Sequence, residues 1–110
     1  MDRDELGALA AFVAVAEERS FTRAAKRLGV SPSALSHAIR GLEERMGVRL
    51  LARTTRSVAP TDAGEQLFTR LKPAFEDVRQ AVDQVSSLRD RPAGRVRLLL
   101  PRSAAMIALV

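Results

Sequence analysis

The chain has 110 residues, of which 46% are hydrophobic, and a formal net charge of +5. This length suits one domain, and the apolar fraction suits a folded core rather than a disordered tail. Cysteine is absent and His37 is the only histidine, which excludes disulfides, thiolate metal sites and mechanisms that need two histidines. No apolar run reaches the ~18 residues of a membrane span, and residues 1–5 lack the apolar segment of a signal peptide, so we expect a cytoplasmic protein.

The net charge of residues 19–56 exceeds that of the whole chain. This segment contains nine Lys or Arg residues and two Glu residues, a net charge of +7, whereas residues 1–18 carry a net charge of −4. A clustered basic surface is typical of proteins that bind polyanions. Basic patches are also common on proteins that bind nothing anionic, so the charge pattern alone does not decide for a polyanion partner.

Two helices are predicted before residue 30. Over residues 3–18 apolar side chains recur at helical spacing, and Asp2 with Glu5 can form a capping box. A short second helix begins at Ser20 or Phe21 and ends at Gly29, where glycine accepts the left-handed conformation. The side chains expected to face the core are Leu6, Leu9, Phe12, Val13, Ala16, Ala24, Ala25 and Leu28.

A third helix is predicted from Pro32 to Gly47, with Ser31 as its N-cap and a buried stripe of Leu35, Ile39, Leu42 and Met46. Two helices joined by a short turn with Gly29 form a helix-turn-helix pattern. The opposite face of the third helix carries Ser33, Ser36, His37 and Arg40. No carboxylate occurs there until Glu43 and Glu44, which we expect to be solvated, so this face can approach phosphate.

Residues 48–60 are predicted to form a small two-stranded wing. Short apolar runs flank the basic, threonine-rich segment Arg53-Thr54-Thr55-Arg56. A protruding basic tip of this kind suits the narrow minor groove of DNA, which attracts arginine.

The clearest periodicity in the chain predicts a long helix over residues 62–89, which begins with a capping box of Asp62 and Glu65. Its apolar residues follow a heptad seam, and a helix about 40 Å long needs a partner helix to cover such a seam. Pro73 predicts a kink or a broken turn near residues 69–73. The residues expected to mediate dimerisation are Leu67, Leu71, Phe75, Val78, Val82 and Val85.

Three parts of the chain are expected. Residues 1–60 form the helix-turn-helix unit with its wing, 61–90 the linker and dimerisation helix, and 91–110 a hinge and the truncated start of a further domain. The predicted fold class is mainly α, with a strand expected over residues 95–100.

The segment SFTRAAKRLGVSPSALSHAIRGLEE, residues 20–44, resembles the helix-turn-helix signature of LysR-type transcriptional regulators. GVRLLARTTR (47–56) and TDAG (61–64) resemble the wing and the start of the linker helix of that family, and GRVRL (94–98) resembles its hinge. The resemblance implies a non-enzymatic, sequence-specific transcriptional regulator that binds double-stranded DNA as a homodimer through antiparallel linker helices.

The resemblance also implies which residues meet DNA. Pro32, Ser33, Ser36 and His37 would enter the major groove, and Arg56 would lie at the wing tip in the minor groove. Many members carry Gln where Pro32 stands and Arg where His37 stands, so the bases read here are expected to differ. With residues at both helix N-termini and along the wing, the full candidate DNA-binding set is Ser20, Thr22, Ser31, Pro32, Ser33, Ser36, His37, Arg40, Arg53, Thr54, Thr55 and Arg56.

No cofactor or metal is expected for this chain. In full-length members of the family a further domain senses a small-molecule effector, and a tetramer is an allowed assembly. Two alternatives stay open: a winged-helix DNA-binding protein of another family with low sequence specificity, and a dimeric protein-interaction module. An enzyme is disfavoured because His37 has neither a nucleophile nor an orienting carboxylate on its helix face.

Overall fold

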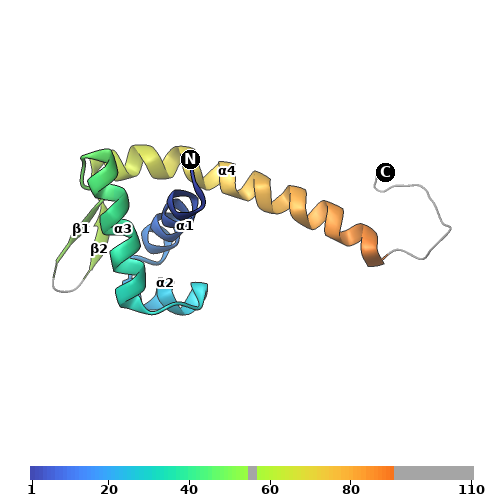
Figure 1. Ribbon diagram of the computed structural model, residues 1–110, viewed down its shortest axis with the longest axis horizontal. Coiled ribbons are helices and arrows are strands. Elements are labelled where there is room, and N and C mark those ends of the chain that lie inside the picture. The colour runs from blue at the N-terminus through green and yellow to red at the C-terminus, as the bar shows by residue number, and fades with distance from the viewer. Residues whose placement is uncertain (55–56, 91–110) are drawn as a thin grey trace. The chain divides into compact units, whose positions relative to one another are not determined.

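Five helices and two short strands make up residues 1–54 and 57–90, the part of the chain that the computed structural model describes. Two structural units divide the chain, Met1–Glu76 and Asp77–Val110. In chain order the elements are α1 (Arg3–Glu18), α2 (Phe21–Leu28), α3 (Pro32–Met46), β1 (Leu51–Arg53), β2 (Val58–Pro60), α4 (Asp62–Ser86) and the 3-10 helix η1 (Ser87–Asp90) (Figure 1). The mainly helical fold, with its helix-turn-helix, wing and long fourth helix, is therefore confirmed. The division of the chain into residues 1–60, 61–90 and 91–110 stays a prediction.

The core of the first unit is built around α1, which contacts α2, α3 and β2. Phe12 and Leu42 are fully buried in it. The prediction that Leu6, Leu28 and Met46 face the core is wrong. Their side chains are 50%, 40% and 44% exposed. All three lie in the first or last turn of a helix, where fewer neighbouring elements cover the side chain than at the middle.

The helix ends follow the predicted capping chemistry. The side-chain oxygens of Asp2, Ser20 and Ser31 each accept a hydrogen bond from the backbone N–H three residues later, at 2.8–3.1 Å. Gly29 and Gly47 end α2 and α3 with φ of 72° and 73°, a backbone conformation that disfavours residues with a β-carbon. These caps fix both ends of α3, the helix on which the candidate site lies.

The predicted wing is confirmed as an antiparallel pair of strands. Leu51 pairs with Pro60 and Arg53 pairs with Val58. The N–H of Thr54 donates to the carbonyl of Ser57 at 2.8 Å, which starts the turn between the strands. Thr55 and Arg56, two of the predicted contact residues, lie outside the described residues.

A junction around Leu50 joins α3, the wing and α4. The carboxylate of Glu43 accepts from the N–H groups of Leu50 (2.7 Å) and Leu51 (3.2 Å). The Leu50 carbonyl in turn accepts from the N–H of Thr61 at 3.0 Å, and the Leu50 side chain is fully buried. The prediction that Glu43 is solvated is therefore wrong: its side chain is 13% exposed, because it satisfies two backbone donors at the start of the wing.

The fourth helix begins at Asp62, as predicted, but its N-cap lies one residue before the predicted capping box. Thr61 is the cap: its Oγ1 accepts from the N–H of Gly64 at 3.1 Å and donates to the carbonyl of Arg49 at 2.6 Å. The box of Asp62 and Glu65 is therefore wrong as a cap, although both acids lie in the first turn, where negative charge is favourable. The helix continues through Pro73, so the broken turn predicted there is absent from α4 as described.

The apolar residues of α4 have two different environments. In the first unit Leu67, Phe68, Leu71 and Phe75 are partly buried and pack against the core. In the second unit Val78, Val82 and Val85 of α4, and Leu88 of η1, are 52–67% exposed. Among the described residues, no helix has the length and apolarity needed to cross a membrane. The hinge, strand and further domain predicted over residues 91–110 lie outside the described residues.

The close approach of α4 to Leu50 predicts a strict requirement for glycine at position 64. A β-carbon there would overlap the carbonyl oxygen of Leu50 and lie 3.2 Å from Cβ of Pro60. We expect Gly64→Ala to lower the free energy of unfolding by about 2–3 kcal/mol, as overpacking against rigid backbone does. Urea denaturation of the wild type and the variant measures this change.

Gly7 is the matched control, because it is exposed within α1 and no atom lies within 4 Å of an added β-carbon. Gly7→Ala should raise the free energy of unfolding by roughly 0.5–1 kcal/mol through helix propensity. Equal effects of the two substitutions would contradict the Leu50 junction.

Candidate nucleic-acid interface

The polar face of α3 is open to solvent, as the sequence predicted. Ser33, His37 and Arg40 are exposed, as is Pro32 in the first turn, and Ser36 is half-buried. On the opposite face Leu35 and Ile39 are 3% and 2% exposed. From Pro32 to Arg40 the helix carries no carboxylate, so a phosphate backbone can approach this face without charge repulsion.

Two predicted contact residues are first of all helix caps. The hydroxyls of Ser20 and Ser31 are engaged by the N–H groups of Arg23 and Ala34 at 3.1 Å. Ser31 also lies 3.3 Å from the hydroxyl of Ser33. Thr22 is exposed in the first turn of α2. The caps orient both helix N-termini, whose remaining N–H groups form a natural seat for phosphate.

Arg53, the last residue of β1, connects the wing to both helices of the helix-turn-helix. Its Nη2 donates to Oγ of Ser36 at 2.6 Å. Its guanidinium carbon lies 4.1 Å from the centre of the Phe21 ring, a cation–π contact. Because Phe21 is the first residue of α2 and Ser36 lies in α3, one side chain contacts both helices of the motif.

A groove of about 580 Å³ lies beside this contact, between α3 and the start of the wing. Its lining includes Phe21, Ser36, Arg40, Arg49 and Arg53. Within the described residues no three His, Cys, Asp or Glu side chains come together in a way that could hold a metal ion. The polar part of the groove lining consists of Ser36 and three arginines, Arg40, Arg49 and Arg53, together with the carboxylates of Glu43 and Glu44, so the groove carries charge of both signs.

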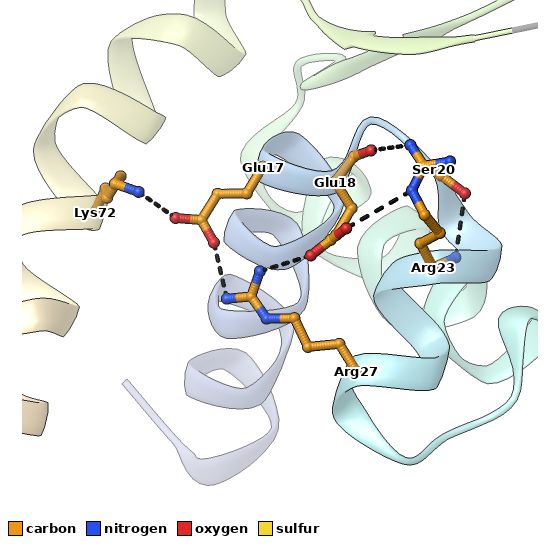
Figure 2. A network of polar contacts seen from close by, with 6 residues as sticks. All are labelled: Glu17, Glu18, Ser20, Arg23, Arg27 and Lys72. Atoms are coloured by element: carbon orange, nitrogen blue, oxygen red, sulfur yellow. Dashed lines mark hydrogen bonds and ion pairs between the residues drawn. The ribbon is translucent and has the colours of Figure 1, made fainter.

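Acidic residues at the end of α1 neutralise cations of α2 and α4. Figure 2 shows Glu17 between Lys72 and Arg27, and Glu18 between Arg27 and Arg23. Glu17 pairs with Arg27 at 2.8 Å, and Glu18 pairs with Arg27 at 3.2 Å and with Arg23 at 3.7 Å. The network ties three helices of the first unit together.

These pairs divide the basic segment into two groups of cations. Arg23 and Arg27 pair with Glu18 and Glu17, and Arg49 lies 3.7 Å from Glu43. Within residues 1–54 and 57–90, five cations of the same segment form no ion pair: Arg19, Lys26, Arg40, Arg45 and Arg53. The positive charge left for an external partner therefore includes the outer face of α3 and the wing.

The network shifts the ionisation of its members. Burial alone raises the pKa of Glu17, but hydrogen bonds from Lys72 and Arg27 outweigh burial and hold this pKa below its ordinary value. The hydrogen bond to Glu17 raises the pKa of Lys72 in return. Glu17 therefore stays ionised, and the network intact, into mildly acidic solution.

The sequence did not predict three contacts that position the site and its supporting helices. Glu43 contacts Leu50, Phe21 contacts Arg53 and Lys72 contacts Glu17, at separations of 7, 32 and 55 residues in the chain. No local spacing signals a contact of that separation. Thr54, predicted to contact DNA, has its hydroxyl 3.1 Å from that of Ser57 in the wing turn.

Comparison with known proteins identifies the family. The model of the family described as "Bacterial regulatory helix-turn-helix protein, lysR family" matches residues 6–65, more than half of the chain. The match covers most of α1, all of α2 and α3, the wing and the first turn of α4.

Curated relatives and solved structures agree with this match. The HTH-type transcriptional regulator PgrR of Escherichia coli K12 is 52% identical over all of this chain and 37% of its own length. A putative transcriptional regulator of Pseudomonas aeruginosa is 48% identical over 97% of this chain and 38% of its own length. The chain thus spans less than two fifths of these relatives. Among solved structures, the BenM_DBD/catB site 1 DNA complex matches with a TM-score of 0.69 and 35% identity, covering 84% of this chain and 99% of that one.

The position of Glu17 between two cations predicts a pH-dependent loss of stability. Glu17→Gln should lower the free energy of unfolding at pH 7 by about 1 kcal/mol, because it removes a partly buried charge paired with Lys72 and Arg27. Urea denaturation at a series of pH values measures it.

The sign follows from the lowered pKa of Glu17. The unfolded chain binds this proton at a higher pH than the folded chain does, so wild-type stability is lost as the pH falls through the folded pKa. The gap between wild type and Glu17→Gln should therefore close in acid. Glu44→Gln removes an exposed carboxylate and is the control, expected to show no such gap. A pH-independent gap for Glu17→Gln would refute the ionic origin.

Proposed function

Because this chain belongs to the LysR family of bacterial helix-turn-helix regulators, we propose that it binds operator DNA sequence-specifically and regulates transcription. The observation that carries the proposal is the solvent-exposed, carboxylate-free face of α3, with Ser33, Ser36, His37 and Arg40. An α-helix fits the major groove, where side chains distinguish all four base pairs. In this proposal α3 is the recognition helix.

Affinity in this proposal comes mainly from phosphate contacts. Arg40 and Arg53, which form no ion pair within the part of the chain that the structure describes, flank the face of α3, and the capped N-termini of α2 and α3 offer N–H groups to phosphate oxygens. The likeness to BenM_DBD in its complex with catB site 1 DNA supports a DNA ligand. We also propose that Arg56 contacts the adjacent minor groove from the wing. The proposed activity is binding rather than catalysis, and a regulator of chromosomal genes would act in the cytoplasm.

We further propose that the protein binds DNA as a homodimer through the second half of α4. Val78, Val82, Val85 and Leu88 repeat at spacings of four and three residues and are each more than half exposed. A stripe of this spacing packs against a second helix. Leu67, Leu71 and Phe75, which the seam also includes, already pack partly against the core of their own unit, so the exposed valines contribute most of the new burial.

Salt dependence tests the DNA-binding proposal. With four to six phosphates neutralised per dimer, the logarithm of the association constant should fall with the logarithm of salt concentration with a slope of roughly −4 to −5. Arg40→Gln should reduce that slope by about two per dimer. Arg23→Gln is the control and should change it less, because Glu18 already pairs with Arg23. A flat salt response would contradict DNA binding and favour a protein-interaction module.

Base discrimination by His37 separates a specific regulator from a general DNA binder. His37→Ala should weaken the preference for one base at a symmetric pair of operator positions. The loss of discrimination should be about 1–3 kcal/mol for each contact. Selection of bound sequences from a random DNA pool, with wild type and variant in parallel, measures this. A wild-type protein that enriches no sequence would favour the alternative of a winged-helix protein with low specificity.

Val82→Asp tests the dimer without attacking the core, since Val82 is 57% exposed. The charge would be desolvated in a helix–helix seam, so we expect a monomer in sedimentation at tens of micromolar and much weaker operator binding. Gln80→Asp places the same charge about 200° around the helix and should leave the dimer intact. A wild-type monomer, or a Val82→Asp dimer, would contradict the proposed interface.

A further inference from the structure

Three segments of the first unit meet at the Arg53 guanidinium. Nη2 of Arg53 donates to Oγ of Ser36 at 2.6 Å, and the guanidinium carbon lies 4.1 Å from the centre of the Phe21 ring. Phe21 is half-buried and packs against the core. The ring therefore gives the guanidinium a fixed platform, and the hydrogen bond aims it at one atom of α3.

The donor and acceptor roles in this contact are unambiguous. Arginine carries only donors, so Ser36 must accept. At 2.6 Å the bond is short and charge-assisted, which makes it the strongest hydrogen bond available to this hydroxyl among its described neighbours. Nη2 of Arg40, one turn further along α3, lies 3.5 Å from the same oxygen and directs a second donor at it.

A serine hydroxyl has two acceptor lone pairs and one O–H donor. Here two guanidinium groups are directed at the lone pairs, at 2.6 and 3.5 Å. The remaining capacity of the hydroxyl is its O–H. Ser36 lies half-buried between the exposed residues Ser33 and His37 on the open face of α3, so that O–H can reach a ligand on this face.

We propose that Arg53 is a positioning residue that makes Ser36 a donor-only contact in the complex with DNA. The inference rests on the DNA-binding function proposed above. The group that Ser36 contacts is a hydrogen-bond acceptor: either a phosphate oxygen or the N7 acceptor on the edge of a purine base. The amino groups of cytosine N4 and adenine N6 are disfavoured, because the hydroxyl has no lone pair left for them.

The test uses operator DNA selected by the wild-type protein and altered one atom group at a time. In one series each purine near the recognition helix is replaced by its 7-deaza analogue, which lacks the N7 acceptor. In a second series each phosphate is replaced by a methylphosphonate. We expect one position in each half-site at which the replacement weakens wild-type binding about fivefold, the loss expected for a single hydrogen bond. The series that contains this position distinguishes a base contact from a phosphate contact.

Protein variants then show which residues cause this sensitivity to the DNA replacement. Ser36→Ala should abolish the sensitivity, and Arg53→Met should abolish it as well, although the hydroxyl of Ser36 is still present. Arg53→Lys keeps a charged donor and should retain part of it. Arg45→Met is the control: Arg45 is exposed on α3 and forms no ion pair among the described residues, so its loss should leave the sensitivity at the same position unchanged.

The outcomes separate this inference from the function on which it rests. If Arg53→Met weakens binding at all positions and keeps the wild-type sensitivity, Arg53 is only a phosphate contact and the inference is wrong. If Arg53→Met fails to fold, Arg53→Lys decides: a reduced sensitivity at this position supports the inference, and a sensitivity equal to that of wild type overturns it. If the wild-type protein selects no DNA sequence, the proposed function itself fails.

Discussion

The backbone of Leu50 is the point on which the relative positions of α3, the wing and α4 depend. Its N–H donates to Glu43 of α3, its carbonyl accepts from Thr61 at the start of α4, and its side chain is fully buried. Gly64 lies so close to the same carbonyl that no β-carbon fits there. Breaking one of these bonds would leave a polar backbone group unsatisfied in a partly buried place, which is costly. We therefore expect α3 and the wing to move as one body.

A few carboxylates divide the cations of the protein into those that form ion pairs within the fold and those that do not. Glu17, Glu18 and Glu43 are partly buried and hold Arg23, Arg27, Lys72 and Arg49 in structural roles. Arg40 and Arg53 instead converge on Ser36 and not on a carboxylate. The same residue type thus stabilises the fold at one place and equips a surface for an anionic, acceptor-rich partner at another. Composition alone cannot separate these two uses.

The sequence predicted most of the fold because its signals are local. Caps at Asp2, Ser20 and Ser31 and the glycines at the ends of α2 and α3 act within a few residues, and these predictions were confirmed. The failures needed tertiary information. Met46 follows the helical period but lies where its helix leaves the core, and Glu43 seemed solvated because its partners are the backbone donors of a later strand. Of the candidate site, sequence predicted the exposed face of α3, but the contact of Arg53 with Phe21 and Ser36 depends on how the wing folds back.

Amide hydrogen exchange of Leu50 and Leu51 tests the central claim most directly. Both N–H groups donate to the Glu43 carboxylate, which is 13% exposed, so neither can exchange until the contact between α3 and the wing opens. If the two elements form one body, these amides exchange as slowly as those of Phe12 and Val15 in the core of α1, at the rate of global unfolding. Exchange of Leu50 and Leu51 at rates near those of an unstructured peptide, with α1 still protected, would show that the wing moves independently of the recognition helix.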